Sequence, residues 1–198
     1  MSVRKKITEP NGVFFITFTC ARWLHLFRLT NGYDVVYKWF DHLKAQGHCI
    51  AGYVIMPSHV HVLIGFRTSR TSINTIIANG KRFMAYELVN KLEAQGNKEM
   101  LELLASYLTK TERLQKQKHK MFQPSFDWKE CYSLPFMQQK VDYMHLNPCK
   151  AGLAKLPEDY QHSSAKYYFT GEQGVYPVIT YMELQDIDLT SQIDDKTA

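Results

Sequence analysis

Two histidines separated by one residue, His59 and His61, have the side-chain type and the spacing for metal chemistry. They begin a run of apolar and β-branched residues, His59–Phe66, that is typical of a β-strand. Side chains alternate between the two faces of a strand, so both imidazoles are expected on one face and Val60 on the other. Two imidazoles in this arrangement can bind one divalent cation. The same short pattern fits a surface strand that carries two histidines by chance, so both interpretations stay open at this point.

A tyrosine near the end of the chain, Tyr143, lies in a predicted helix. This helix begins after Ser133, a suitable cap, and ends near Leu146, because Asn147-Pro148 follows. One stripe of the helix is apolar and is expected to pack on a sheet. Tyr143 and Asn147 lie on a more polar stripe and are neighbours, since they are four residues apart. A helical tyrosine more often packs than reacts, and only the histidine pair elsewhere in the chain makes Tyr143 a candidate nucleophile.

Strand and helix patterns alternate along the chain and predict the elements that must position these side chains. Strand patterns cover Val13–Cys20 and Cys49–Met56, and a two-residue link, Pro57-Ser58, favours antiparallel pairing of the second strand with the histidine strand. A fourth strand is expected within His119–Trp128. Apolar residues at helical spacing predict three more helices, over Tyr33–Gln46, Ser72–Ala94 and Lys98–Leu114. This order predicts an α+β fold, a ferredoxin-like (RRM-like) sandwich in which an antiparallel sheet of four to five strands has helices on one face.

The composition limits the class of protein. A hydrophobic content of 45% is enough for a packed core, which excludes a disordered chain. A net charge of +5 suits an anionic partner. The four cysteines have no C-x-x-C spacing, which argues against a zinc ribbon and a disulfide scaffold and favours the reduced thiols of a cytoplasmic protein. No apolar run approaches the ~18 residues of a membrane span, so no membrane association is expected.

A basic run that precedes several aromatic residues is a candidate surface for single-stranded nucleic acid. Bases can stack on the aromatic rings while phosphates pair with lysine and arginine, although a run of charges is more often a solvated face. The candidate DNA contacts in this run are Lys110, Arg113, Lys116, Lys118 and Lys120. Three further candidates are Lys81 and Arg82, in the predicted helix Ser72–Ala94, and Lys140, one turn before Tyr143.

Several motifs in a fixed order resemble one family. The two most specific are M-P-S-H-V-H-V-L-I at Met56–Ile64 and V-D-Y-M-H-L-N-P-C-K-A-G-L at Val141–Leu153. Three shorter ones are F-F-I-T-F-T at Phe14–Thr19, F-D-W-K-E at Phe126–Glu130 and L-P-E-D-Y-x-x-S-S at Leu156–Ser164. Together they resemble the single-tyrosine HUH transposases, in the branch of the REP-associated tyrosine transposases, which are relatives of the small bacterial insertion-sequence transposases.

The resemblance implies a chemistry and assigns residues to it. His59 and His61 match the metal-binding histidines of the HUH motif, and Tyr143 matches the nucleophile. Asn147 stands where relatives usually have a glutamine as a third metal ligand. Mg²⁺ or Mn²⁺ is the implied cofactor. The implied reaction cleaves and rejoins single-stranded DNA, beside a hairpin, through a covalent 5′-phosphotyrosine.

The chemistry of the residues agrees with this assignment. A phenol has a pKa of about 10 and needs help to attack at neutral pH. A metal ion that neutralises the phosphate supplies such help without an acid–base pair. Lys140 is expected either to favour the phenolate or to contact the phosphate, although a solvated helix lysine fits the sequence as well.

The resemblance also implies an organisation. Residues 1–168 are expected to form a single HUH transposase-like catalytic domain, and residues 169–198 a C-terminal accessory tail, which is acidic. The expected setting is the bacterial cytoplasm, at the nucleoid during action, with single-stranded or hairpin DNA as the partner. Monomer and homodimer both stay open. Two other functions fit the sequence: a domesticated DNA-processing nuclease that does not transpose, and a non-enzymatic RRM-like nucleic-acid-binding protein.

Overall fold

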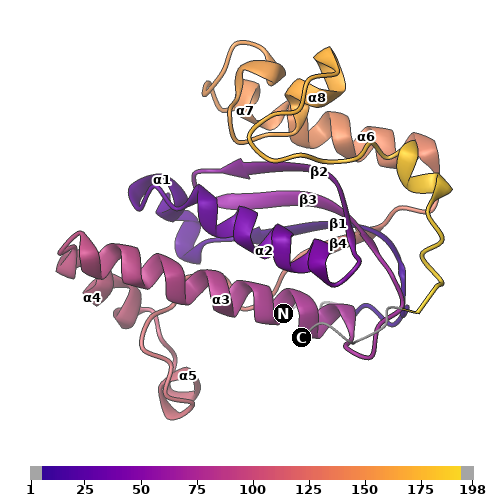
Figure 1. Ribbon diagram of the computed structural model, residues 1–198. Helices are drawn as coiled ribbons and strands as arrows, with labels where there is room; N and C mark the ends of the chain where they lie inside the picture. Colours follow the sequence, from indigo (N-terminus) through magenta and orange to yellow (C-terminus); the bar gives the residue numbers. More distant parts are fainter. Residues whose placement is uncertain (1–5, 193–198) are drawn as a thin grey trace.

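An antiparallel sheet of four strands, in the spatial order β2-β3-β1-β4, forms the centre of the protein (Figure 1). This computed structural model describes residues 6–192. The strands are β1 (Gly12–Thr19), β2 (Cys49–Met56), β3 (His59–Phe66) and β4 (Asp127–Glu130). Pro57-Ser58 joins β2 to β3, whose end residues Met56 and His59 pair directly. The predicted α+β class with an antiparallel sheet is confirmed, and the sheet has the lower of the two expected strand numbers.

Two long helices cover one face of the sheet. They are α2 (Tyr33–Ala45) and α3 (Ile73–Ala94), and the side chain of Ser72 caps α3 by accepting a hydrogen bond from the Thr75 amide. Their apolar stripes meet the residues of β1 and β3 that point to this face, in a core that includes Trp39, Phe40, Ile77, Phe18 and Val62. Gly80 of α3 lies directly against the Trp39 ring, where a Cβ would collide with the indole.

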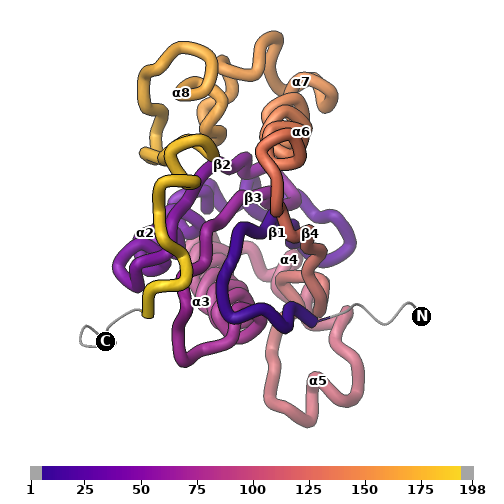
Figure 2. The backbone as a smooth tube through the Cα atoms, turned by 90° about the vertical axis from the view of Figure 1, so that its right-hand side faces the viewer, coloured from indigo at the N-terminus to yellow at the C-terminus, as the bar shows by residue number. Residues whose placement is uncertain are grey.

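A third helix, α6 (Leu134–His145), packs on the opposite face, which the sequence analysis did not predict. Figures 1 and 2 show α6 on one side of the sheet and both α2 and α3 on the other. Met137, Val141 and Met144 of α6 belong to a second apolar cluster with Val54 and Leu63 of the sheet. The prediction of helices on one face therefore holds for α2 and α3 but leaves out α6.

Short elements connect the main ones. They are η1 (Ala21–Trp23), α1 (Leu26–Leu29), α4 (Lys98–Ser106), α5 (Lys110–Leu114), α7 (Asn147–Lys150), η2 (Pro157–Asp159), α8 (Ala165–Thr170) and η3 (Glu183–Asp186).

Two predicted boundaries differ from the structure. The helix expected over Lys98–Leu114 is two helices, α4 and α5, because Thr109 forms a capping box with Glu112 and starts a new helix there. The strand expected within His119–Trp128 is confined to β4, which begins at Asp127. Before β4 only Phe122 pairs with the sheet, through an isolated bridge to Cys20.

The described part of the predicted tail, residues 169–192, runs along the β2 side of the protein (Figure 2, yellow). The Ile179 amide donates to the Ile50 carbonyl at 3.2 Å, and the Tyr176 hydroxyl donates to Asp41 of α2 at 2.9 Å. Residues 193–198, the last part of that tail, lie outside the described residues. The four cysteines form no disulfide. Within the described range, no helix is both long and apolar enough to span a membrane.

Acid should destabilise the fold partly through His48. Burial, with the nearby His42 and Arg67, lowers the pKa of His48 to about 4, whereas an unfolded histidine titrates near ~6.5. The unfolded chain therefore binds a proton first as the pH falls, so the stabilisation is complete above ~6.5 and is lost between there and about 4. The free energy of unfolding, measured by urea denaturation across this pH range, should change less steeply with pH in His48→Gln than in wild type. The difference in slope should be up to ~1.4 kcal/mol per pH unit. Equal slopes in the two proteins would contradict this assignment.

Candidate functional site

The two histidines of β3 lie side by side on the face that α6 covers. Their ring centroids are 4.8 Å apart. In the register with β1, His61 pairs with Thr17 and His59 with Thr19. Thr17 Oγ1 lies 2.7 Å from Nδ1 of His61, and Ser58 Oγ lies 3.1 Å from Nδ1 of His59. When Nδ1 donates its proton to these oxygens, Nε2 of each ring carries the lone pair that a metal ion needs.

Burial keeps both imidazoles neutral. It lowers the pKa of His61 to about 3, with a smaller contribution from His59, and it lowers the pKa of His59 to about 4, with a smaller contribution from His25. Neutral imidazole is the form that binds metal ions, so at neutral pH no proton has to leave these rings before a cation binds.

Tyr143 of α6 reaches the histidine pair. Its ring centroid lies 5.4 Å from that of His61 and 6.2 Å from that of Phe15 on β1. Met144, the next residue, is buried against the sheet, whereas Tyr143 is 45% exposed. The phenol is thus held at the edge of α6, next to the histidines and open to a substrate from solvent.

Asn147 lies one turn after Tyr143, at the start of α7. Its Nδ2 donates a hydrogen bond to the Tyr143 carbonyl at 2.8 Å, which leaves its amide oxygen as an acceptor. In the described part of the chain, no three or more His, Cys, Asp or Glu side chains are grouped to hold a metal ion. By donor type, neutral imidazoles and an amide oxygen suit a divalent cation that takes its other ligands from water or phosphate.

Two lysines flank the candidate nucleophile. The ammonium of Lys140 lies 4.8 Å from the Phe136 ring centroid and 5.8 Å from that of Phe15. The ammonium of Lys150, on α7, lies 5.8 Å from the Tyr143 ring centroid. The sequence analysis named Lys140 but missed Lys150, although a residue seven positions after Tyr143 lies about two helical turns further along the same side.

Thr17 and Trp23 also contact the histidines and were missed. Trp23 packs edge-on against His59 at 5.3 Å between ring centroids. The contact of Thr17 with His61 depends on the register between β1 and β3, and that of Trp23 depends on the path of the chain after β1. Neither can be read from residue spacing.

The basic run lies elsewhere. Figures 1 and 2 show α5 on the opposite side of the sheet from α6, so the run is not brought together with Tyr143 and the histidines. Lys110, Lys116 and Lys118 are exposed. Lys120 forms an ion pair with Glu112 at 2.8 Å, and Arg113 donates to the Ala105 carbonyl at 2.8 Å. Arg82 is exposed on α3.

Lys81 has a structural role instead of the predicted DNA contact. It is 8% exposed, and its ammonium donates to the carbonyls of Gln123, Pro124 and Ser125 at 2.7, 3.4 and 3.0 Å. These bonds fix the irregular segment that leads into β4. Burial of the side chain and these hydrogen bonds favour a structural role for Lys81 over the predicted DNA contact.

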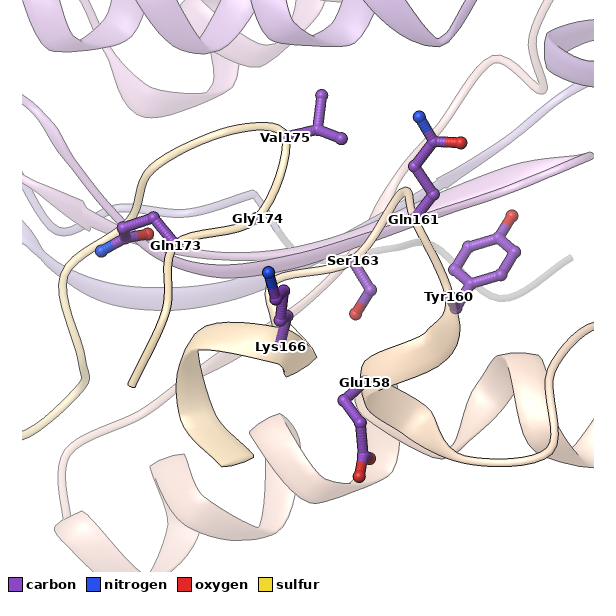
Figure 3. A pocket seen from close by; sticks show the side chains of 8 residues that line it. All are labelled: Glu158, Tyr160, Gln161, Ser163, Lys166, Gln173, Gly174 and Val175. Carbon is purple, nitrogen blue, oxygen red and sulfur yellow. The ribbon is translucent and has the colours of Figure 1, made fainter. Parts of the chain in front are cut away.

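A hollow of about 200 Å³ lies away from these residues, around α8 and η2 (Figure 3). Glu158, Ser163 and Lys166 are among the side chains that line it. Lys166 forms an ion pair with Glu172 at 2.9 Å, so its charge is already balanced. None of the predicted site residues lines this hollow.

Neighbouring substitutions on α3 separate the structural lysine from the exposed arginine. Lys81→Met should lower the free energy of unfolding by about 2 kcal/mol, because buried carbonyls lose their charged donor. Folded Lys81→Met should bind single-stranded DNA with the wild-type dependence on salt. Arg82→Met should change stability by less than about 0.5 kcal/mol and, if Arg82 contacts a phosphate, reduce the salt slope by about one. Urea denaturation and binding titrations at several salt concentrations measure both, and a reduced salt slope in Lys81→Met would contradict its structural role.

Comparisons with known proteins give a structural match. No family model and no curated protein matches the sequence. A REP-associated tyrosine transposase bound to a REP hairpin matches with a TM-score of 0.57 and 17% identity, over 98% of this chain and 100% of that chain. A protein of Deinococcus radiodurans R1 assigned as a transposase matches with a TM-score of 0.41 and 14% identity, over 71% of this chain and 95% of that chain, which is too distant to support the fold assignment. The chain therefore has the fold of a REP-associated tyrosine transposase.

Proposed function

We propose that this chain is a metal-dependent transposase that cleaves and rejoins single-stranded DNA through a covalent 5′-phosphotyrosine at Tyr143. The observation that carries the proposal is the short distance between the Tyr143 and His61 rings, 5.4 Å between centroids. His59 is beside them, 4.8 Å from His61. A phenol on one helix and two neutral imidazoles on one strand therefore face the same space, where one phosphodiester can contact all three.

The chain's own residues supply the nucleophile and its positioning. The Tyr143 oxygen attacks the scissile phosphorus, the bond to the 3′-oxygen breaks, and the phenolic proton balances the 3′-hydroxyl that is released. The Lys150 ammonium lies near the Tyr143 ring, and Lys140, one turn before Tyr143, contacts Phe15; both can stabilise negative charge on the phosphate. The phosphotyrosine stores the energy of the broken bond, so the reverse attack by a 3′-hydroxyl rejoins DNA.

His59, His61 and Asn147 are the residues proposed to hold Mg²⁺ or Mn²⁺. A bound divalent cation would neutralise and orient the scissile phosphate, which lowers the barrier to attack. The hydrogen bonds of the two Nδ1 atoms to Thr17 and Ser58 fix how the rings point.

The proposed partner is single-stranded DNA beside a hairpin. The matched REP-associated transposase is bound to a REP hairpin, and this chain shares its fold over nearly its whole length. The exposed lysines of the basic run supply positive charge on the opposite side of the sheet, where they would contact phosphates away from the cleavage point.

A non-enzymatic RRM-like function fits the structure less well. Such proteins stack bases on an open sheet face. Here α6 packs on that face through Met137, Val141 and Met144. On this face the strands themselves carry the histidine pair, and none of the exposed large hydrophobic side chains of the described residues lies in a strand.

A covalent adduct is the first expected result. Labelled DNA hairpins with single-stranded flanks, incubated with the protein and Mn²⁺ or Mg²⁺, should give a protein–DNA adduct on a denaturing gel. Tyr143→Phe should abolish the adduct, because it removes the attacking oxygen. His59→Ala or a chelator should reduce it strongly. Tyr167→Phe, in α8, is the control and should leave it unchanged. An adduct that survives Tyr143→Phe would overturn the assignment.

The Thr17 hydroxyl should matter for metal affinity. Thr17→Val keeps the side-chain volume but removes the oxygen that lies 2.7 Å from His61. Metal binding, measured by calorimetry with Mn²⁺, should weaken roughly 10- to 100-fold, the usual effect of losing such a partner. Thr17→Ser retains the hydroxyl and should stay close to wild type. Equal affinities in Thr17→Val and wild type would show that the hydroxyl does not orient the ligand.

A further inference from the structure

A continuous row of side chains crosses the face that carries Tyr143. From its α6 end, the Tyr132 ring stacks on Phe136 at 6.1 Å between centroids, and the Lys140 ammonium lies 4.8 Å from Phe136. Lys140 also contacts Phe15, whose ring centroid lies 6.2 Å from that of Tyr143 and 5.4 Å from that of His61, so these three rings form a cluster at the middle of the row. Beyond Tyr143 the row continues through the two histidines to Trp23. We call this set the ring row; it consists of Tyr132, Phe136, Lys140, Phe15, Tyr143, His61, His59 and Trp23.

The two ends of the ring row are exposed aromatic residues. Tyr132 is 84% exposed and Trp23 is 58% exposed, whereas Phe15 and His61 near the middle are buried. Large rings that are mostly in solvent gain little for the fold, because burial in the core is what makes such residues stabilising. Tyr132 and Trp23, at the two ends of the row that contains Tyr143, are therefore candidates for contacting a ligand rather than for stabilising the fold.

The backbone at Trp23 is strained. Arg22 and Trp23 have φ values of 51° and 60°, in the left-handed region that bulky residues seldom adopt. Hydrogen bonds to the link between β2 and β3 hold the segment there: the Cys20 amide donates to the Ser58 carbonyl at 2.8 Å, and the Phe27 amide donates to the Pro57 carbonyl at 3.1 Å. Strain that the surroundings enforce is common at binding sites. Here it fixes the indole beside His59.

The charge around Trp23 suits a polyanion. Arg22 and Arg28, one residue before and five residues after Trp23 in the sequence, are exposed, and the sequence from Asn11 to Tyr33 contains no Asp or Glu. Exposed aromatic rings among cations are the combination that holds single-stranded DNA, since bases stack on rings while phosphates meet lysine and arginine.

We propose that Trp23 and Tyr132 are base-stacking platforms that hold nucleotides on opposite sides of the scissile phosphate. Because Tyr143 belongs with Phe15 and His61 to the cluster at the middle of the ring row, a strand laid along the row presents its phosphate to the phenol with a base held on each flank. The placement of the two nucleotides on opposite sides of the scissile phosphate rests on the proposed function, whereas the stacking of bases on Trp23 and Tyr132 does not. Each ring contacts one nucleotide, and the strand follows the ring row across the sheet.

The test measures binding without chemistry. Tyr143→Phe protein in chelator is titrated with a fluorescent DNA hairpin that has single-stranded flanks on both sides. Trp23→Ala and Tyr132→Ala should each weaken binding about 5- to 100-fold, the effect of losing one stacked base. Trp23→Phe should recover most of the affinity. Trp23→Gly accepts the positive φ and should fold stably yet bind as weakly as Trp23→Ala. Phe169→Ala, which removes an equally exposed ring on α8, should have no effect.

A scan with abasic nucleotides locates each contact. The penalty of Trp23→Ala should vanish when one particular base is missing, and that of Tyr132→Ala when a different base is missing. At least one nucleotide should separate the two positions, and the cleavage point mapped with wild-type protein should lie between them. Unchanged affinity in both alanine variants, or penalties that no abasic position removes, would overturn the proposal. If wild type forms no adduct but the two positions are found, stacking stands and the proposed function fails.

Discussion

The packing of α6 on the sheet is the interaction on which the candidate site depends. Met137, Val141 and Met144 fix how the helix is rotated, and that rotation brings Tyr143 to the histidines of β3. Gly52 of β2 allows α6 to pack this closely, because a Cβ at position 52 would lie 2.5 Å from the terminal methyl of Met144. Tyr143 and the imidazoles come from segments far apart in the sequence, so their contact results from apolar burial rather than from any local pattern.

The same burial sets the electrostatics of the site. The histidines lie on the face that α6 covers, with His61 beside Phe15, and removal from water lowers the pKa of both. Tyr143 is on the rim of the packed region and stays accessible. This face of the sheet is therefore buried at His61, where the imidazole stays neutral, and exposed to solvent at Tyr143.

Much of this arrangement could be predicted from residue spacing. The alternation of a strand places His59 and His61 on one face, and a separation of four makes Tyr143 and Asn147 neighbours. Long periodic segments gave α2 and α3 to within a residue or two of their ends. The resemblance to the transposases joined the histidines to the tyrosine, which spacing alone could not do.

The failures have physical reasons. Thr17 and Trp23 depend on strand register and on a strained turn, and both are set by long-range contacts. The capping box at Thr109 starts a separate helix within the segment that was expected to be one helix up to Leu114. Lys81 was predicted as a surface cation because lysine usually is one, yet it lies four residues after Ile77 and three before Met84, on the stripe that faces the core. The spacing of the apolar residues around Lys81 therefore indicates a buried position, although lysine is usually exposed.

The edges of the sheet are protected in two different ways. Along β2, the Ile55 amide donates to the His162 carbonyl, and the Tyr53 carbonyl accepts from the Ser164 amide. Farther along β2, the stretch that contains Ile179 adds its own bond, so the outer backbone groups of this strand are largely used within the chain. The other edge, β4, is only four residues long and carries Asp127, Lys129 and Glu130. A sheet with one covered edge and one short, charged edge offers other copies of the protein little template for intermolecular strand pairing or aggregation.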